Sequence, residues 1–457
     1  MARNEDADMT QKIATIVLAA GQGTRMKSDT HKVLHPIAGR PMLHHLLASV
    51  AKLAPTETVV VVGAGREQIE AALQGSDAKF AVQAEQLGTG HAVQQAEEAL
   101  KGFDGDVLIL YGDVPLVSDA TMTRMIQRLH GADAPAAVVL GFRPEDPAAY
   151  GRIVADAAGV IAKMVEFKDA SEEERAIDLC NSGLMAVRAA DLFALLARVK
   201  NENAAGEYYL PDIVMLAAAD GRASAVIETG AWEVAGVNSR AELAAVEGEW
   251  QRRRRIKAMA DGVTLIAPET VWFAHDTVIA RDVTIEPNVY FGPGVTVASG
   301  AVIHGFSHIE GAVIGTGAQV GPYARLRPGA VLEEGSKAGN FVEIKNARLG
   351  AGAKANHLTY LGDADVGAGA NIGAGTITCN YDGYFKHRTI IGERAFIGSN
   401  SALIAPVKIG RDAIVAAGSA VSRDVGDGEM RMVRAEQLVK PGWADRFHDV
   451  MKRKKGG

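Results

Sequence analysis

At 457 residues, with 48% hydrophobic and 23% charged residues, the chain has the composition of a soluble globular protein with room for two or three domains. Its net charge of −7 argues against a general nucleic-acid binder, and no apolar run approaches the ~18 residues of a membrane span. Cys180 and Cys379 form no CxxC pair, and the first ten residues, MARNEDADMT, are polar and acidic. These features predict a cytoplasmic protein without a secretory signal.

The first 238 residues alternate short apolar runs with helical patterns. Because strands and helices in alternation build parallel sheets covered on both faces, this half is predicted to be a Rossmann-like α/β domain. The predicted buried strands are residues 13–20, 58–63, 79–83, 106–112 and 136–142. Ligands of such sheets bind beyond the carboxyl ends of the strands, where Gly21 and Asp113 both lie.

The loop that follows the first strand, LAAGQGTRMKSDTHK (residues 18–32), combines two glycines with cations. This loop has neither the Lys-Ser/Thr pair that closes a P-loop nor the third glycine of a dinucleotide-binding loop. The segment VVGAGREQ also lacks that third glycine, because Gln68 stands in its place. A tight turn can still aim backbone N–H groups at an anion. Arg25 can then donate a forked pair of hydrogen bonds to phosphate, and Lys32 adds a mobile charge. The alternative is an ordinary turn with solvated cations.

Asp113 directly follows the apolar run VLILYG. A carboxylate at the edge of the sheet, beside polyphosphate, suits a divalent cation that is held by one or two protein oxygens and by substrate phosphates. The structural alternative is a helix cap. Ser118 is the better cap for the helix that begins at SDATM, which leaves Asp113 for the metal.

Residues 239–262 are predicted to form one long connecting helix. Ser239 and Glu242 have the spacing of a capping box, and Leu243, Val246 and Trp250 share one helical face. The basic runs RRRR (252–255) and KRKK (452–455) are interpreted as solvated faces or tails rather than as nucleic-acid or membrane sites.

From about residue 263 the hydrophobic period becomes six, which neither an amphipathic helix nor a half-buried strand explains. A parallel β-helix of hexapeptide repeats does, because each repeat forms one side of a triangular coil and points one aliphatic residue to the axis. The two uninterrupted series are Ile314, Val320, Leu326, Leu332, Ala338 and Ile344, and then Ile391, Ile397, Leu403, Ile409, Val415 and Val421.

A series of motifs runs through the first half: LAAGQGTRMKSDTHKVLHPIAGRPM, QAEQLGTGHA and LYGDVPL, then YGRIV, VEFKDA, CNSGLM, GEYYLPDIV and GVNSR. Together they resemble the sugar-1-phosphate nucleotidyltransferases, and among these the bifunctional enzymes that make UDP-N-acetylglucosamine. The second half matches too, so the resemblance covers nearly the whole chain. It implies a uridyltransferase domain over 1–238, a helical linker over 239–262, and a left-handed β-helix acetyltransferase domain with a tail over 263–457.

For the first half, the resemblance implies a site for UTP and N-acetylglucosamine 1-phosphate. Arg25 and Lys32 would stabilise the departing pyrophosphate, and Asp113 and Asn238 would bind Mg²⁺. The sugar phosphate would attack the α-phosphorus in line, without a covalent enzyme intermediate. The residues implied for nucleotide and sugar are Leu18, Ala19, Ala20, Gly21, Lys32, Gln83, Gly88, Thr89, Tyr111, Gly112, Asp113, Gly151, Glu166, Asn181 and Asn238.

For the second half, the resemblance implies that His357 is the general base for attack of the glucosamine 1-phosphate amine on acetyl-CoA. Glu343 is a candidate to orient His357, and Tyr381 or a nearby backbone amide could stabilise the oxyanion. The sugar phosphate would contact Arg327, Lys345, Tyr360 and Asn371, and acetyl-CoA would contact Ala374, Asn380, Tyr381, Ser399, Ala417 and Arg434. The resemblance further implies a homotrimer with this site between neighbouring subunits.

Several alternatives remain at this stage. The β-helix could serve only for assembly beside a single-function nucleotidyltransferase, or the chain could be a sugar-binding scaffold. A zinc hydrolyase would need three convergent ligands, which His304 and His308, four residues apart in a six-residue repeat, should not supply. Cys379 could form an acyl-enzyme, although direct transfer needs no thiol.

Overall fold

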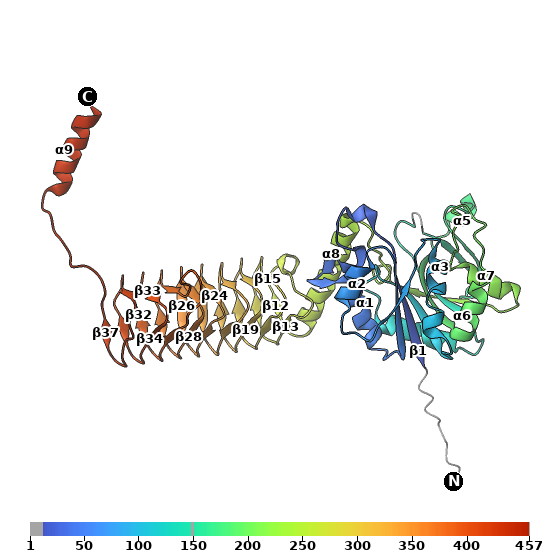
Figure 1. The fold of residues 1–457 in the computed structure, drawn as a ribbon, viewed down its shortest axis with the longest axis horizontal. Coiled ribbons are helices and arrows are strands. Elements are labelled where there is room, and N and C mark those ends of the chain that lie inside the picture. The colour runs from blue at the N-terminus through green and yellow to red at the C-terminus, as the bar shows by residue number, and fades with distance from the viewer. Residues whose placement is uncertain (1–11, 148–149, 457) are drawn as a thin grey trace, which may run out of the picture. The chain divides into compact units, whose positions relative to one another are not determined.

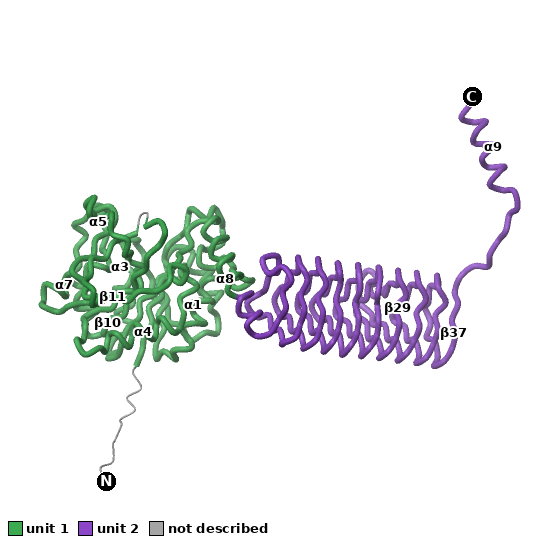
Figure 2. The backbone as a smooth tube through the Cα atoms, turned by 180° about the vertical axis from the view of Figure 1, so that it is seen from behind, with its two compact units in different colours: residues 1–253 green, residues 254–457 purple. Residues whose placement is uncertain are grey.

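The computed structural model describes residues 12–147 and 150–456, which form two compact units divided between Arg253 and Arg254 (Figure 2). The acidic first ten residues, on which the prediction of no secretory signal rests, lie outside the described residues. None of the described helices combines the length and the apolar character that crossing a membrane requires.

The first unit is built on a nine-stranded mixed sheet (Figure 1). Its main path runs β11 (Ala225–Thr229), β7 (Ala137–Phe142), β10 (Cys180–Arg188), β6 (Asp106–Tyr111), β1 (Ile13–Ala19), β4 (Glu57–Val62) and β5 (Lys79–Val82), with β8 (Arg152–Ala155) and β9 (Ile161–Val165) attached through β10. Strand β1 is parallel to β4 and β6, whereas β10 is antiparallel to β6 and β7. The predicted α/β sheet is confirmed, but it is less parallel than expected, because β8, β9 and β10 run antiparallel to the strands with which they pair.

Two apolar clusters cover the opposite faces of this sheet. Ile16 and Ile109 belong to one cluster, and their sequence neighbours Val17 and Leu108 belong to the other. Both faces are buried, which explains why the strands are apolar throughout instead of alternating. The helices are α1 (Met42–Ala51), α2 (Arg66–Ala72), α3 (Thr89–Gln94), α4 (Asp119–Leu129), α5 (Glu172–Arg175), α6 (Ala189–Leu196) and α7 (Asp212–Ala219). Ser118 caps α4, as predicted, by accepting from the Thr121 N–H at 3.1 Å.

Strand β5 departs from the prediction of a buried strand over residues 79–83. It lies at the edge of the sheet, with Phe80 and Val82 37% and 41% exposed and only Ala81 buried. A short apolar run does not show whether a strand will have neighbours on both sides. Strand β5 pairs with β4, and none of the described strands pairs with its other side.

Helix α8 (Arg240–Ala260) contains the division between the units. Leu243, Val246 and Trp250 pack against a small cluster with Met26 and Met42, so their predicted common face is real. At its start, Ser239 accepts from the Glu242 N–H at 3.3 Å, while the Glu242 carboxylate accepts from the Asn238 N–H at 2.6 Å, one residue before the expected partner.

The RRRR run of α8 is engaged within the chain. Arg252 and Arg253 both pair with Glu249 at 2.7 Å. Arg254 and Arg255 donate to backbone carbonyls, among them that of Thr277 at 2.8 Å. Only Arg252 is exposed and the other three arginines are half-buried, so the interpretation of the run as a solvated face is only partly right: these partners give it a structural role within the chain.

The second unit is a left-handed parallel β-helix whose coils stack in register (Figure 1). The first face comprises β13 (Val278–Ile279), β16 (Thr296–Val297), β19 (Ala312–Ile314), β22 (Ala330–Leu332), β25 (Arg348–Leu349), β28 (Ala364–Val366), β31 (Thr389–Ile391) and β34 (Val407–Ile409). The second comprises β12 (Thr264–Leu265), β14 (Thr284–Ile285), β17 (Val302–Ile303), β20 (Gln319–Val320), β23 (Lys337–Asn340), β26 (Lys354–His357), β29 (Asn371–Ile372), β32 (Phe396–Ile397), β35 (Ile414–Val415) and β37 (Met430–Arg431). The third comprises β15 (Tyr290–Phe291), β18 (His308–Ile309), β21 (Arg325–Leu326), β24 (Glu343–Lys345), β27 (Tyr360–Gly362), β30 (Ile377–Cys379), β33 (Ala402–Ile404) and β36 (Ala420–Val421).

Every member of the two predicted hexad series is at most 1% exposed, which confirms that these residues fill the axis. Beyond the coils lies the solvent-exposed helix α9 (Trp443–Lys455), which carries the KRKK run in its last turn.

The first unit also contains a small antiparallel hairpin of β2 (Pro36–Ile37) and β3 (Arg40–Pro41).

Candidate functional sites

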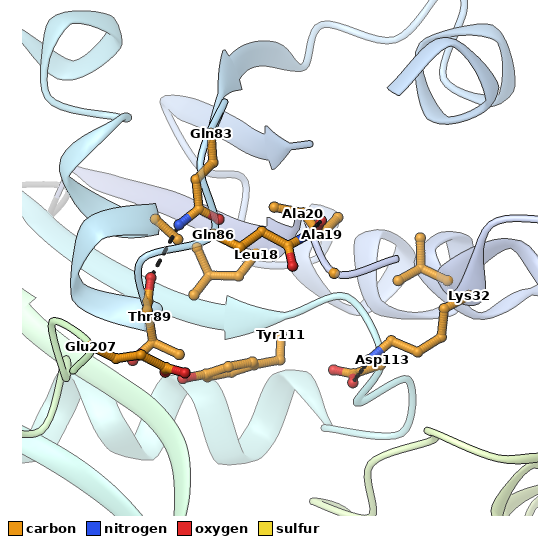
Figure 3. A pocket seen from close by; sticks show the side chains of 14 residues that line it. Leu18, Ala19, Ala20, Lys32, Gln83, Gln86, Thr89, Tyr111, Asp113 and Glu207 are labelled. Atoms are coloured by element: carbon orange, nitrogen blue, oxygen red, sulfur yellow. Dashed lines mark hydrogen bonds and ion pairs between the residues drawn. The ribbon is translucent and has the colours of Figure 1, made fainter. Parts of the chain in front are cut away.

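A cavity of about 340 Å³ lies beyond the carboxyl ends of β1 and β6 (Figure 3). The predicted residues that line it are Leu18, Ala19, Ala20, Gly21, Lys32, Gln83, Gly88, Thr89, Tyr111 and Asp113. Gln83 and Thr89 lie at one end and Lys32 and Asp113 at the other (Figure 3). The lining does not include Arg25, which is exposed on a short 3₁₀ turn, or Gly112, whose N–H donates to the Leu18 carbonyl at 2.9 Å.

Gly23 explains how the loop brings Lys32 to the cavity. Its φ of +67° lies in the left-handed region, and a Cβ on it would stand 2.6 Å from the Lys32 Cβ. A glycine is therefore required for the loop to close over the Lys32 stem, and the Lys32 ammonium extends to the cavity.

Lys32, Asp113 and Asn238 converge on one point. The Lys32 ammonium donates to Asp113 Oδ2 at 2.5 Å and to Asn238 Oδ1 at 3.0 Å, and the Lys32 and Asp113 side chains are 12% and 15% exposed. The ammonium shows that the two oxygens can face a single cation, and carboxylate and amide oxygens are ligands that Mg²⁺ accepts. The donor set therefore fits the expected metal.

No cluster of three or more His, Cys, Asp and Glu side chains suited to a metal ion occurs within residues 12–147 and 150–456. A two-ligand site is consistent with an ion that completes its coordination with substrate oxygens. The zinc alternative finds no support: His304 pairs with Glu286 at 3.0 Å, and His308 stacks on Tyr290 at 4.8 Å between ring centroids.

At the opposite end of the cavity, the polar residues are fixed by the chain itself. The Gln83 amide, 5% exposed, donates to the Gly88 carbonyl at 3.1 Å, and the Thr89 hydroxyl accepts from the Leu210 N–H at 3.1 Å. Gly88, at a φ of +111°, leaves no room for a Cβ, which would stand 2.6 Å from the Tyr208 carbonyl oxygen. This rigid edge suits recognition of a flat ring by hydrogen bonds.

Sequence reasoning missed two polar residues of the lining, Gln86 and Glu207, besides the apolar Val33 and Ala92. Gln86 donates to the Ala20 carbonyl at 2.8 Å and so closes the loop over the cavity, and Glu207 forms part of the wall. Gln86 lies in the motif QAEQLGTGHA and Glu207 in GEYYLPDIV. Their polar side chains within these motifs were the only feature of the sequence that could have indicated them.

Close to Tyr111, which lines this cavity, the fold brings together three further predicted residues, Gly151, Glu166 and Asn181. A Cβ on Gly151 would stand 3.2 Å from both Glu166 carboxylate oxygens, and the Asn181 N–H donates to the Gly151 carbonyl at 2.9 Å. Glu166 also lines a second cavity of about 430 Å³ with Asp169 and Asp212. Burial first, and then Asp212 and Asp169, raise the pKa of Glu166, and burial likewise raises the pKa of Tyr111.

The raised pKa of Glu166 gives a pH prediction. A carboxylate accepts hydrogen bonds from sugar hydroxyls, and Glu166 takes up a proton at a higher pH than an ordinary glutamate. As pH falls from neutral, KM for N-acetylglucosamine 1-phosphate should rise about tenfold, while KM for UTP changes little. The control is Glu166→Gln, whose side chain does not titrate. Because the substrate's own titration affects both proteins equally, KM for N-acetylglucosamine 1-phosphate should depend less on pH in the variant than in the wild type. Identical profiles would contradict a role for Glu166 in sugar binding.

In the β-helix, strand register aligns the predicted base with the predicted coenzyme residues. Ala338, Ala355, Ile372, Ile397 and Val415 are paired partners on successive coils of the second face. The residues two positions further along therefore stack at one corner, and these are Asn340, His357, Ala374, Ser399 and Ala417. Backbone hydrogen bonds continue along this corner, from Asn400 to Ala374 at 2.7 Å and from Gly418 to Ser399 at 2.8 Å, and Arg434 donates to the Ala417 carbonyl at 2.9 Å.

His357 is exposed and held by one neighbour. Its Nδ1 lies 2.5 Å from Asn340 Oδ1, so Nδ1 carries the proton in this contact and Nε2 is the basic nitrogen. The expectation that Glu343 orients His357 is wrong, because the Glu343 carboxylate accepts from Arg327 at 2.8 Å instead. An amide in this place fixes the tautomer without adding a charge.

The predicted sugar-phosphate residues lie on the two faces that meet at this corner, with Arg327 and Lys345 at the far end of their strands on the third face. Arg327 and Lys345 follow Leu326 and Ile344, which are partners on neighbouring coils of the third face, and Tyr360 lies opposite Glu343. Asn371 lies on the second face, opposite Lys354, one coil beyond His357. The pKa of Lys345 is lowered, chiefly by contact with Lys386 of the loop between β30 and β31.

In that loop, Asn380 and Tyr381 hydrogen-bond within the chain. The Asn380 amide donates to Asp363 Oδ2 at 2.5 Å, and the Tyr381 hydroxyl donates to the Gly383 carbonyl. Tyr384 and Phe385 at the tip are 88% and 71% exposed. The loop is thus internally ordered and presents aromatic rings to solvent.

These features define a nucleoside-triphosphate transferase fold joined to a hexapeptide-repeat transferase. Residues 15–178 match the MobA-like NTP transferase domain, residues 276–311 the bacterial transferase hexapeptide (six repeats), and residues 388–423 the hexapeptide repeat of succinyl-transferase.

The chain belongs to the family of bifunctional GlmU proteins. It is 75% identical over 465 residues to the bifunctional protein GlmU of Novosphingobium aromaticivorans, covering 98% of this chain and 99% of that protein. It is 71% identical over 447 residues to that of Sphingopyxis alaskensis, covering 98% and 99%. The chain is a bifunctional transferase of UDP-N-acetylglucosamine synthesis, with glucosamine-1-phosphate N-acetyltransferase and uridyltransferase activities. The single-function and scaffold alternatives are therefore set aside.

Proposed function

We propose that each activity resides in one unit, with uridylyl transfer at the cavity beside β1 and β6 and acetyl transfer at the His357 corner. The observation that carries this division is that the residues implied for uridylyl transfer lie in the first unit and those implied for acetyl transfer lie in the second. We keep the domain limits 1–238, 239–262 and 263–457 for these functions, with α8 as the linker.

In the first unit, Gln83, Gly88 and Thr89 would hold the uracil, and Leu18 to Gly21 with Lys32 would hold the phosphates. Gly151, Glu166 and Asn181 would position the acetamido sugar so that its phosphate attacks the α-phosphorus in line. Asp113 and Asn238 would hold Mg²⁺, which supplies charge neutralisation on the phosphates. Arg25, exposed at the loop, would close onto the pyrophosphate.

In the second unit, His357 Nε2 would take the proton from the C2 amine as the nitrogen attacks the thioester carbonyl, and the coenzyme thiolate would leave. Arg327 and Lys345 would bind the sugar phosphate, with Tyr360 and Asn371 contacting the sugar. Acetyl-CoA would lie along the corner formed by Ala374, Ser399 and Ala417, with Arg434, Asn380 and Tyr381 as further contacts. A backbone amide would suit the oxyanion better than Tyr381, whose hydroxyl is directed to Gly383.

We infer a homotrimer, as the resemblance to the bifunctional enzymes implies, and an exposed apolar row beside His357 supports self-association of the chain. Phe306, Tyr323, Phe341 and Leu358 lie on successive coils and are 48–62% exposed; the first three stack at 5.0 and 5.2 Å between ring centroids. A second copy of the chain would cover this row and so bring its surface to the His357 corner. We further propose that the protein acts in the cytoplasm, where its thiols stay reduced.

Metal removal separates the two activities. With excess EDTA, pyrophosphate release from UTP and N-acetylglucosamine 1-phosphate should fall at least about 10²-fold, because the phosphate charge is no longer neutralised. Thiol release from acetyl-CoA and glucosamine 1-phosphate should stay within about twofold. Both assays use the full-length protein, and added Mg²⁺ should restore the first. Equal loss of both activities would contradict the assignment of the metal to the first unit alone.

A further inference from the structure

The segment VVGAGREQ (residues 61–68), which joins β4 to α2, lines no part of the first cavity but lies against the loop that carries Lys32. Because β1 and β4 pair in parallel, the loops that follow them leave the sheet at the same edge. A Cβ on Gly63 would stand 2.7 Å from the Ala20 carbonyl oxygen, so a glycine is needed for this close approach. The segment therefore supports the loop of residues 20–32, named here the phosphate loop, from one side.

Gln68, in the first turn of α2, joins the segment to the phosphate loop through both polar atoms of its side-chain amide. Its Oε1 accepts from the His31 N–H at 2.8 Å, and its Nε2 donates to the Asp29 carbonyl at 2.9 Å. The two hydrogen bonds span 37 and 39 positions of the sequence. Backbone groups outside helices and strands need such partners, and one glutamine here supplies both a donor and an acceptor.

These hydrogen bonds fix the residue that directly precedes Lys32. The His31 side chain is 5% exposed, and its ring nitrogens have no hydrogen-bond partner among the described residues, so its polar anchor is the backbone N–H. The His31 carbonyl accepts from the Leu34 N–H at 2.9 Å and so begins the short 3₁₀ turn Lys32–Leu34. Holding His31 thus determines where this turn begins and where the backbone of Lys32 stands.

The residue on the other side of Lys32 is anchored in the core, since Val33 is 1% exposed. Gln68 itself is exposed, whereas its neighbour Ile69 is completely buried and makes the core contact of α2. Removing the Gln68 amide should therefore loosen the phosphate loop without opening the core.

We propose that Gln68 is a positioning residue for uridylyl transfer, which fixes the phosphate loop so that the Lys32 ammonium reaches the phosphates of UTP. The inference rests on the proposed role of Lys32 at those phosphates. Gln68 does not touch the substrate and acts through His31. An ammonium on a fixed backbone loses less freedom when it binds an anion than one on a mobile loop. The glycine-containing segment that fails the dinucleotide pattern thereby acquires a function, the support of a neighbouring phosphate loop.

The test is Gln68→Met in the full-length protein, which roughly keeps the length of the side chain and removes both hydrogen bonds. Because a small displacement of Lys32 weakens its effect on the departing pyrophosphate, kcat for pyrophosphate release should fall about ten- to a hundredfold. KM for N-acetylglucosamine 1-phosphate should stay within about twofold, since the change does not reach the sugar site. Thiol release by the same preparation should be unchanged.

Gln74→Met is the matched control, because Gln74 is an exposed glutamine just past the end of α2. It should leave pyrophosphate release unchanged, and its midpoint of thermal unfolding should equal that of Gln68→Met. Gln68→Glu keeps the acceptor for the His31 N–H but sets a carboxylate against the Asp29 carbonyl. It should therefore not restore the rate.

A double-mutant cycle with Lys32→Met separates positioning from general support of the fold. Lys32→Met removes the group that Gln68 is proposed to place, so adding Gln68→Met should lower kcat no further. A purely structural role would lower kcat by the same factor with and without Lys32. That additive result, or a raised KM for every substrate, would overturn the proposal.

Wild-type kcat in Gln68→Met would also overturn it, and Lys32→Met distinguishes that failure from a wider one. If Lys32→Met loses uridylyl transfer while Gln68→Met keeps it, Lys32 retains its role without help from Gln68. If both variants keep it, the proposed role of Lys32 is wrong as well.

Discussion

His357→Ala should lower kcat for acetyl transfer about 10²–10⁴-fold and leave uridylyl transfer within about twofold. The ring is exposed, its Nδ1 is held by Asn340 at 2.5 Å, and the proposed coenzyme residues stack on the following coils at the same corner. Removing the ring deletes the proposed proton acceptor without disturbing the buried axis. The measurement is a pair of assays on one preparation, thiol release and pyrophosphate release.

His304→Ala is the matched control for this change. His304 is also a histidine of the β-helix with a ring nitrogen held by a neighbour, Glu286 at 3.0 Å, but it lies three coils before His357, whereas the proposed coenzyme residues lie on the coils after it. Its loss should leave both activities near wild type. If His304→Ala and His357→Ala impaired acetyl transfer equally, the effect would be on folding, and the base would have to be sought elsewhere.

Asp113→Asn should lower kcat/KM for uridylyl transfer about 10²–10³-fold and leave acetyl transfer unchanged. The substitution keeps the shape of the side chain and removes the charge that faces Lys32 at 2.5 Å and, in the proposed complex, Mg²⁺. Two defects follow: weaker metal binding and a Lys32 ammonium without its carboxylate partner. Titration with Mg²⁺ at saturating UTP separates them, because only the first is relieved by more metal.

Asp119→Asn supplies the control for Asp113. Asp119 lies in the first turn of α4 and pairs with Lys52 at the surface, at 3.0 Å. Exposed pairs of this kind contribute little, so both activities should remain near wild type. Full uridylyl transfer by Asp113→Asn at ordinary Mg²⁺ would remove Asp113 from the site.

The parts of the fold that sequence reasoning predicted best are those with a strict period. Six-residue spacing requires that the members of the two series, which begin at Ile314 and at Ile391, face one axis, and all twelve of them are buried. The resemblance to the sugar-1-phosphate nucleotidyltransferases, which rests on a series of motifs, implied ten of the residues that line the cavity, from Leu18 to Asp113. The β-helix was thus predicted from repetition within the sequence, and the cavity lining from likeness to a known family.

The remaining features depend on contacts across the fold. The burial of β5 depends on whether a second strand pairs with its free edge. The four residues of β5 do not determine this. The partner of His357 is Asn340, seventeen positions earlier, and only strand register between coils makes them neighbours. Gln86 and Glu207 reach the cavity by way of loops, where spacing carries no periodic signal.

The central claim is that two separate sites, each dispensable for the other reaction, operate in one chain. It is tested most directly by the rate of UDP-N-acetylglucosamine formation from glucosamine 1-phosphate, acetyl-CoA, UTP and Mg²⁺. Neither Asp113→Asn nor His357→Ala alone should sustain this rate, whereas a mixture of the two purified variants should restore it, because one makes the acetylated intermediate and the other consumes it. A mixture as inactive as its components, although each variant retains its own remaining activity, would contradict two independent sites.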